Sequence, residues 1–213
     1  MKIDLHTHSV ASPDGSLTEE DYRRMLDDGS LDYIAVTDHN TISFAQELHE
    51  KIGHQIIVGE EITTRDGEII GLYLQSPIRP GMSAVETISA IKAQEGLVYI
   101  PHPFETVRKG IKQELLDEVS LGVDIIEVHN GRAVFQNTSK QAEAWAAEHK
   151  RARAASSDSH GKYGWGRTYT ELEAAPSRAN IVELLTNATF KVGRPGLRGI
   201  LYPKFNRIRR RRA

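Results

Sequence analysis

Short apolar or alternating runs recur along the chain, and stretches with helical character separate them. This alternation is typical of βαβ units that build a mostly parallel sheet or barrel. We therefore predict one continuous α/β domain. The expected strands lie at residues 2–5, 33–36, 55–58, 68–74, 97–100, 125–128, 153–155 and 168–172.

Helix start signals fall between these strands. Thr18 precedes an acidic first turn, Thr41 precedes the segment 42–51, and Ser83 with Glu86 fits a capping box. Further helices are expected over residues 112–120, 135–149 and 177–185. After about Lys191 the chain becomes rich in Gly and Pro, which predicts an extended or docking segment instead of another βα unit. We divide the chain accordingly into a domain over residues 1–190 and an extension over residues 191–213.

Composition narrows the possible chemistry. The 213 residues include no cysteine, which excludes disulfides, thiolate nucleophiles and sulfur-ligated zinc sites. Hydrophobic residues make up 39% of the chain, which is enough for the core of one domain. No run approaches the ~20 apolar residues that span a bilayer, so we expect no transmembrane segment and a cytoplasmic location.

The net charge of -2 hides an asymmetry along the chain. Five of the 27 Lys and Arg residues are Arg207 and residues 209–212, so residues 1–206 carry 22 basic against 29 acidic side chains. That balance argues against a body that coats nucleic acid. The Arg-rich tail is either a solvated end or a contact for an acidic partner, RNA or anionic lipid.

Histidines gather where the predicted strands end. Six of the nine do so, namely His6, His8, His39, His102, His129 and His160. Carboxylates accompany them at the ends of the same strands, at Asp38, at Glu60 and Glu61, and at Asp158. The carboxyl ends of parallel strands meet at one edge, so we expect these side chains to converge on a single site. Imidazole suits zinc, iron and manganese while carboxylates bridge ions, so the set predicts two or three divalent metal ions (Mn, Zn or Fe).

These motifs resemble those of the PHP superfamily, the polymerase and histidinol phosphatase superfamily of metal-dependent phosphoesterases. The resemblance covers residues 1 to about 172. Five motifs occur in family order, at residues 4–9, 37–41, 59–63, 101–104 and 157–160. The resemblance implies a distorted (β/α)7 barrel, an α/β fold with a trinuclear metal site at the C-terminal rim of its strands.

The resemblance also implies a set of metal ligands, which are His6, His8, Asp14, His39, Glu61, His102, His129, Asp158 and His160. Asp14 lies in a Ser-Pro-Asp-Gly sequence, so turn formation is an alternative explanation for that aspartate. Asn130 is an alternative to His129, although imidazole is the better donor. The family pattern Gly-x-Glu selects Glu61 and leaves Glu60 on the opposite face of the strand. His129 and Asp158 are also our candidate catalytic residues.

The implied activity is hydrolysis of a small phosphomonoester by a hydroxide that bridges metal ions. Such a reaction needs no protein nucleophile, which agrees with the missing cysteine and the absence of a Gly-x-Ser-x-Gly motif. Arg132 and Arg167 follow rim segments and are our candidate phosphate ligands, with surface salt bridges as the alternative. The expected partner is a small phosphorylated substrate or the end of a short oligonucleotide.

Three other functions stay open. An exonuclease or oligonucleotide phosphodiesterase would need a basic track, and the Arg-rich tail is the candidate for one. A non-catalytic metal-binding module that docks through the C-terminal extension is the second, although the complete ligand set argues against it. An amidohydrolase shares the opening His-x-His but normally places a lysine between its metals, where this chain has Glu61.

Overall fold

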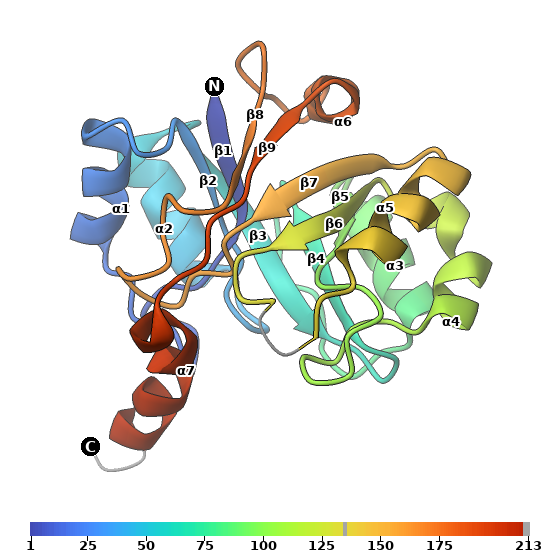
Figure 1. Ribbon diagram of the computed structural model, residues 1–213, viewed down its shortest axis with the longest axis horizontal. Coiled ribbons are helices and arrows are strands. Elements are labelled where there is room, and N and C mark those ends of the chain that lie inside the picture. The colour runs from blue at the N-terminus through green and yellow to red at the C-terminus, as the bar shows by residue number, and fades with distance from the viewer. Residues whose placement is uncertain (134–135, 211–213) are drawn as a thin grey trace.

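A computed structural model describes residues 1–133 and 136–210. The predicted strands are present with shifted ends, and a further strand follows them. The largest shift is in the third strand, which continues five residues beyond its predicted end, from Val58 to Thr63. Their bounds are β1 Lys2–Thr7, β2 Tyr33–Val36, β3 Ile56–Thr63, β4 Glu68–Leu72, β5 Leu97–Ile100, β6 Ile125–Asn130, β7 Ala152–Ser156, β8 Tyr169–Glu171 and β9 Thr189–Lys191. They form one sheet in the order β7-β6-β5-β4-β3-β2-β1-β8-β9 (Figure 1).

The first seven strands curl into a distorted barrel. β1, β2 and β3 are parallel, and so are β5, β6 and β7, whereas β4 runs antiparallel to both of its neighbours. The end strands β1 and β7 approach each other, because Thr7 bridges Ser159 and the His8 amide donates to the Ser159 carbonyl over 2.8 Å. The predicted distorted (β/α)7 barrel is therefore confirmed, with one strand reversed.

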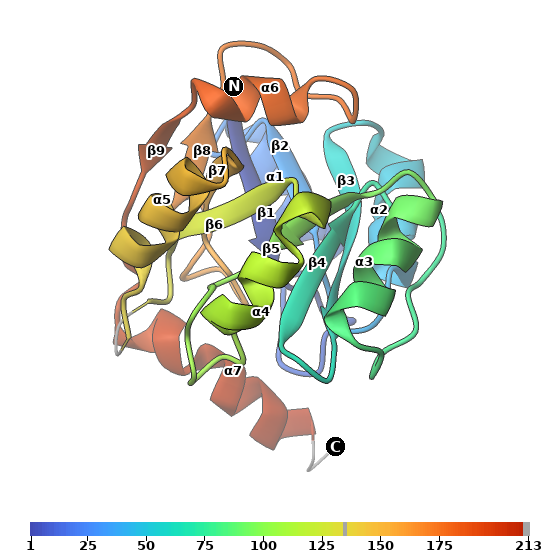
Figure 2. The same cartoon turned by 90° about the vertical axis from the view of Figure 1, so that its right-hand side faces the viewer.

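Helices cover the outside of the barrel and one end of it. Their bounds are α1 Glu19–Asp27, α2 Ser43–Ile52, α3 Ala84–Ala93, α4 Gln113–Glu118, α5 Ser139–Glu148, α6 Ile181–Thr186 and α7 Leu197–Arg210. The predicted capping boxes are present at Thr18 and Ser83. α2 begins after Ile42 without a side-chain cap, and the first residue predicted for α5 lies outside the described residues. Figures 1 and 2 place α6 and α7 at opposite ends of the barrel.

Two apolar clusters make up the core. One joins the strands to the helices on the outside of the barrel, with Tyr22, Leu48 and Trp145 among its members. The other takes side chains from all seven barrel strands and from α6. Because every strand contributes to it, the second cluster fills the barrel interior at the end that α6 covers. The opposite end, where α7 lies, is left to polar residues.

The C-terminal extension differs from the prediction. Residues 197–210 form a 14-residue helix, α7, and not an extended segment. Pro203 lies inside this helix, and the Gly-Pro composition that suggested extended chain is concentrated in the residues just before it. Among the described residues, no helix has the length and apolar character needed to cross a membrane.

Glu60 occupies the face of β3 opposite to Glu61. Glu60 Oε2 accepts a hydrogen bond from the Ile78 amide over 2.8 Å, while Glu60 Oε1 is buried without a hydrogen-bond partner among the described residues. Burial raises the pKa of Glu60 to about 7. The charged form is therefore disfavoured in the folded chain.

We expect Glu60→Gln to stabilise the protein at alkaline pH. A carboxyl whose folded pKa lies above its unfolded value near 4.5 loses stability as pH rises from about 5 through 7. The free energy of unfolding of Glu60→Gln minus that of wild type should be about 2 kcal/mol higher at pH 8 than at pH 4. Urea denaturation at both pH values measures this, with the exposed Glu20→Gln as control. An identical pH dependence in wild type and Glu60→Gln would contradict the assignment.

Candidate metal centre

Eight of the nine predicted metal ligands meet at the rim of the barrel. His6 and His8 come from the end of β1, Glu61 from β3, and the others from the segments that follow strands. All are buried except His39, whose side chain is 16% exposed. The eight residues are His6, His8, Asp14, His39, Glu61, His102, Asp158 and His160. Separate motifs thus converge as the strand-end argument predicts.

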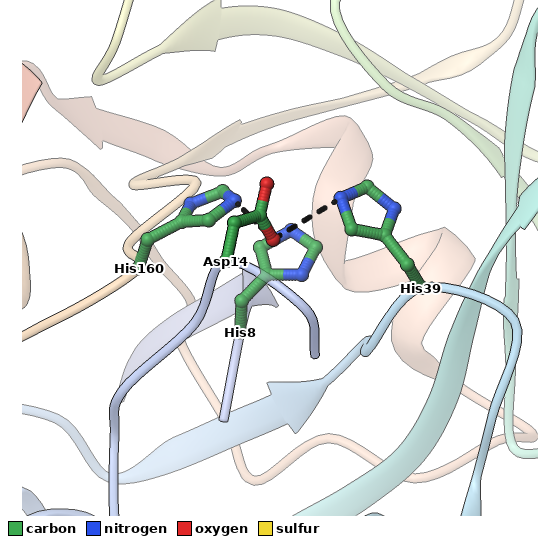
Figure 3. A group of neighbouring side chains, drawn as sticks. All are labelled: His8, Asp14, His39 and His160. Carbon is green, nitrogen blue, oxygen red and sulfur yellow. Dashed lines mark ion pairs between the residues drawn. The ribbon is translucent and has the colours of Figure 1, made fainter. Parts of the chain in front are cut away.

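Asp14 and three histidines form one half of the cluster (Figure 3). Asp14 Oδ1 lies 3.4 Å from His160 Nε2 and 3.6 Å from His39 Nε2. The His8 ring lies between the other two, with ring centroids 4.1 Å from His160 and 4.7 Å from His39. A carboxylate and three imidazoles at this spacing offer four ligand atoms to one cation.

The turn that carries Asp14 depends on the glycine after it. A Cβ atom on Gly15 would lie 2.1 Å from the Ser9 carbonyl oxygen, so a larger residue would force the backbone apart. The Ser12 hydroxyl donates to Asp14 Oδ1 over 3.2 Å. Asp14 therefore lies in a turn and also occupies a position predicted for a metal ligand.

Glu61 connects the two halves of the cluster. Glu61 Oε2 lies 3.2 Å from the ring nitrogens His8 Nε2 and His39 Nδ1, and 3.4 Å from His6 Nε2. Its other oxygen, Oε1, lies 3.1 Å from His102 Nε2. One carboxylate thus faces imidazoles from both halves, which is the arrangement of a bridging ligand.

The histidine nitrogens that point away from the cluster have acceptors of their own. His6 Nδ1 lies 3.1 Å from Glu127 Oε1, and His160 Nδ1 lies 2.9 Å from the Asp158 carbonyl oxygen. The Glu127 carboxylate only accepts, so His6 Nδ1 donates and Nε2 is the His6 nitrogen that faces the cluster. His160 Nδ1 lies between an acceptor, the Asp158 carbonyl, and a donor, Arg132 Nη1 at 3.2 Å, while His160 Nε2 faces Asp14 in the cluster.

The electrostatics keep the carboxylates ionised. Burial opposes this, but the surrounding histidines and arginines outweigh it and hold the pKa values of Glu61, Asp14 and Asp158 well below their ordinary range. Burial, His8 and Arg132 lower the pKa of His160 to about 3. His6 differs, because three carboxylates outweigh its burial and raise its pKa well above the ordinary value. Charged carboxylates around imidazoles favour a bound cation.

Backbone strain is concentrated at this rim. His102 and Asp158 have φ angles of 31° and 52°, in the left-handed region that residues other than glycine rarely adopt. Prolines flank His102 on both sides. Such conformations cost of order 1–3 kcal/mol each and persist mainly at functional sites, where the surrounding contacts enforce them.

Three residues of the site escaped prediction. Glu68 completes a group with His39 and Glu61, and burial and Glu61 raise its pKa to about 9. It begins β4, and because β4 is reversed its first residue lies at the rim where other strands end. Glu127 contacts His6 from inside β6, two residues before the predicted His129. Arg108 lies in a loop far from any strand end and donates to Asp158 Oδ2 over 2.7 Å.

His129 is the predicted ligand that the structure does not bring to the cluster. Its Nε2 lies 3.0 Å from Glu143 on α5, and its ring packs on Phe190. The pairing of β6 with β7 shifts between Glu127 and His129, so this irregularity turns His129 outward and places Asn130 on the inner face. The prediction of His129 as ligand and catalytic residue therefore disagrees with its position.

The two candidate phosphate ligands lie in different surroundings. Arg132 lines the cavity above the cluster, with its Nη1 3.2 Å from Asp158 Oδ1 and from His160 Nδ1. Arg167 is exposed and is absent from the described residues that line this cavity. The position of Arg132 agrees with a role at the site, whereas that of Arg167 does not.

Comparison with known proteins supplies two relatives from Methanocaldococcus jannaschii. The uncharacterized protein MJ1587 is 33% identical over 150 residues, which cover 64% of this chain and 88% of that protein. The uncharacterized protein MJ0417 is 31% identical over 178 residues, covering 79% of this chain and 69% of the relative. The chain belongs to one family with these two proteins. No family model matches it.

Solved structures identify the fold. A two-domain protein from Bacteroides vulgatus, described as containing a predicted PHP-like metal-dependent phosphoesterase, superposes with a TM-score of 0.71 at 23% identity, over 97% of this chain and 69% of the other. This chain therefore has a PHP-like fold. PsfC from Pseudomonas syringae superposes on this chain with a TM-score of 0.65 at 18% identity, over 99% of this chain and 98% of the other. The lesion-specific endonuclease EndoQ from Pyrococcus furiosus superposes with a TM-score of 0.60 at 15% identity, over 90% of this chain and 57% of the other.

The donor atoms at this rim fit divalent metal ions. Four overlapping groups of three or four side chains each place their ligand atoms within 4.8 Å of one another. His6, His8, His39 and Glu61 each belong to two of these groups. The donors are nitrogen and oxygen only, which suits manganese, iron or zinc. The rim thus has the donor chemistry and the spacing that suit divalent cations.

Proposed function

We propose that this protein is a metal-dependent phosphoesterase that hydrolyses a small phosphomonoester. The observation that carries the proposal is the convergence of five histidines and three carboxylates from separate strand ends on one buried site. The PHP fold supports it, since structures with this fold include one described as a predicted metal-dependent phosphoesterase. The proposed reaction needs no protein side chain as its nucleophile, and the chain has no cysteine for that role.

The eight converging residues can be assigned as ligands of two or three metal ions. We propose that His8, Asp14, His39 and His160 hold one ion, while His6, His102, Asp158 and Glu61 hold the others, with Glu61 shared. Bound Mn, Zn or Fe would acidify a water molecule and neutralise charge on the phosphoryl group. Glu127 and the Asp158 carbonyl fix the ring orientations of His6 and His160, so the donor atoms need little rearrangement when a metal binds.

The cavity above the cluster suits a small substrate. It has a volume of about 490 Å³, and Asp14, Glu61 and Asp158 are among the residues that line it. Arg108 and Arg132 also line it, and both contact Asp158. Their guanidinium groups are placed to orient phosphoryl oxygens beside the metal ligands.

Arg132→Ala is expected to lower turnover while metal content persists. Arg132 reaches the cavity but is not among the grouped metal donors, so its removal takes away a phosphate contact and leaves the ligands in place. We expect kcat/KM to fall by about 10- to 100-fold. Steady-state kinetics and metal analysis of the same preparation measure the two effects, with Arg167→Ala as the matched comparison. Wild-type kinetics in Arg132→Ala would remove this arginine from the site.

A nuclease is the second candidate function. EndoQ, a structural neighbour at 15% identity, is an endonuclease, so the PHP fold also occurs in an enzyme that acts on nucleic acid. Oligonucleotide binding needs a basic track, and Lys204 and Arg207 of α7 line the cavity. The products separate the two functions, because a nuclease releases nucleotides and a phosphatase releases free phosphate.

The decisive experiment measures both products on a panel of phosphomonoesters and short oligonucleotides with added Mn²⁺. We expect free phosphate from monoesters in the wild type and none in His8→Ala. Shortened oligonucleotides with no free phosphate from monoesters would support the nuclease. Inactivity on every substrate, with metal bound, would favour a non-catalytic docking module.

A further inference from the structure

The C-terminal helix α7 forms one wall of the cavity above the metal centre. Leu201, Pro203, Lys204 and Arg207 line this cavity together with barrel residues. Figures 1 and 2 both place α7 at the end of the barrel opposite to α6. A segment that follows the barrel in sequence therefore contributes side chains to the space where a substrate would lie.

Specific contacts hold α7 at this position. Arg207 Nη2 donates to Asp14 Oδ2 over 2.5 Å, while Asp14 Oδ1 faces His39 and His160. The side-chain amide of Asn206, through Nδ2, donates to the backbone carbonyl of Asp14 over 2.8 Å. One oxygen of Asp14 thus serves the metal centre and the other serves α7, so the helix is joined directly to a proposed metal ligand.

A polar groove continues the cavity outward. It measures about 470 Å³, and Asn40 and Thr63 lie in its wall. Four residues line both spaces, namely His39, Glu68, Lys109 and Arg207. Two cationic side chains therefore line both the cavity and the groove. Lys109 comes from the loop after β5, and Arg207 comes from α7.

The cations of the cavity fall into two classes. Arg108 donates to Glu105 and Asp158, and Arg132 donates to Asp158, so these contacts hold both arginines beside the proposed metal ligands, at the site proposed for the first phosphate. The ammonium groups of Lys109 and Lys204 make no hydrogen bond or ion pair to any described residue, although Glu68 lies near Lys109. Arg207 contacts Asp14 through a single nitrogen, and its side chain is 60% exposed.

We propose that Lys109, Lys204 and Arg207 form a second anion subsite, so that the substrate carries another anionic group besides the phosphate at the metal centre. This inference rests on the proposed phosphoesterase function. The ammonium groups of Lys109 and Lys204, which pair with no described residue, and the Arg207 nitrogens that Asp14 does not engage are available to a ligand. A second phosphate or a carboxylate supplies the matching acceptors. The distance between the two anionic groups of the substrate then determines which esters the enzyme selects.

Three related esters test the subsite through hydrolysis. Glycerol 3-phosphate has one anionic group, 3-phosphoglycerate adds a carboxylate, and 2,3-bisphosphoglycerate adds a second phosphate as well. We expect the wild-type KM to be about tenfold lower for an ester with the additional group. In Lys109→Ala and in Lys204→Ala, the KM for an ester with the additional group should rise about tenfold more than the KM for glycerol 3-phosphate. Lys140→Ala, which removes an exposed cation on α5, should change neither value.

A binding measurement separates the subsite from the proposed activity. Calorimetric titration of the Mn²⁺-loaded protein with propylphosphonate and with 3-phosphonopropanoate requires no turnover. Tighter binding of the second compound, lost in Lys204→Ala with metal content unchanged, supports the subsite even if no ester is hydrolysed. Equal affinity for both compounds in wild type would overturn the subsite and leave the phosphoesterase proposal standing.

Discussion

His8→Ala is expected to abolish metal binding and phosphate release without unfolding the chain. His8 belongs to two of the four groups of donor atoms, and its Nε2 lies 3.2 Å from Glu61 and 3.6 Å from Asp158. Removing it takes a donor from both halves of the cluster at once. We expect activity to fall by at least about a thousandfold, because catalysis by bound metal ions supplies most of the rate.

The measurement combines metal analysis, kinetics and circular dichroism on the same preparation. His129→Ala is the matched control, because it also removes an imidazole from the end of a strand but one that pairs with Glu143 outside the cluster. The control should keep its metal and its activity. Full activity in His8→Ala, or loss of metal in His129→Ala, would refute the cluster as the structure arranges it.

Glu61→Gln is expected to be as severe, although it changes one atom of the side chain. Both carboxylate oxygens of Glu61 face imidazoles, and the charge compensates protonated His6 when no metal is bound. The neutral amide removes this charge and places an NH₂ group, which cannot ligate a metal, where an oxygen stood. We expect loss of metal and of activity, and a loss of about 1–3 kcal/mol in the free energy of unfolding in EDTA.

The pH dependence of that stability loss has a definite sign. Because the folded pKa of Glu61 lies below the ordinary value near 4.5, the stabilisation is present above that value and is lost as pH falls. Urea denaturation at pH 7 and at acid pH measures it. For metal content, Glu60→Gln is the matched control, since Glu60 lies on the opposite face of β3 and this variant should keep its metal. Equal metal content in Glu61→Gln and wild type would contradict a bridging role.

Much of the barrel and most of the site follow from local sequence. β2 and β5 have the predicted bounds because uninterrupted apolar runs favour buried parallel strands. The helices at Thr18 and Ser83 begin where the capping pattern places them, since a cap involves residues only three positions apart. Eight of the predicted ligands converge because polar residues at the ends of parallel strands share one edge, whatever the details of packing.

Other features depend on contacts between distant segments, and no local pattern determined them. The shift in pairing between β6 and β7 turned His129 outward and Asn130 inward, and strand alternation alone predicts the opposite. The reversal of β4 brought Glu68 to the rim. Helix α7 took its place through Asp14, nearly 200 residues earlier in the chain.

The sequence by itself thus determined the class of fold, the edge at which the site lies and the kind of ligands in it, because hydrophobic periodicity and strand ends are local properties. The tertiary structure alone decided which of two neighbouring residues faces the site and which cations reach the cavity, because register and docking depend on pairing across the whole barrel.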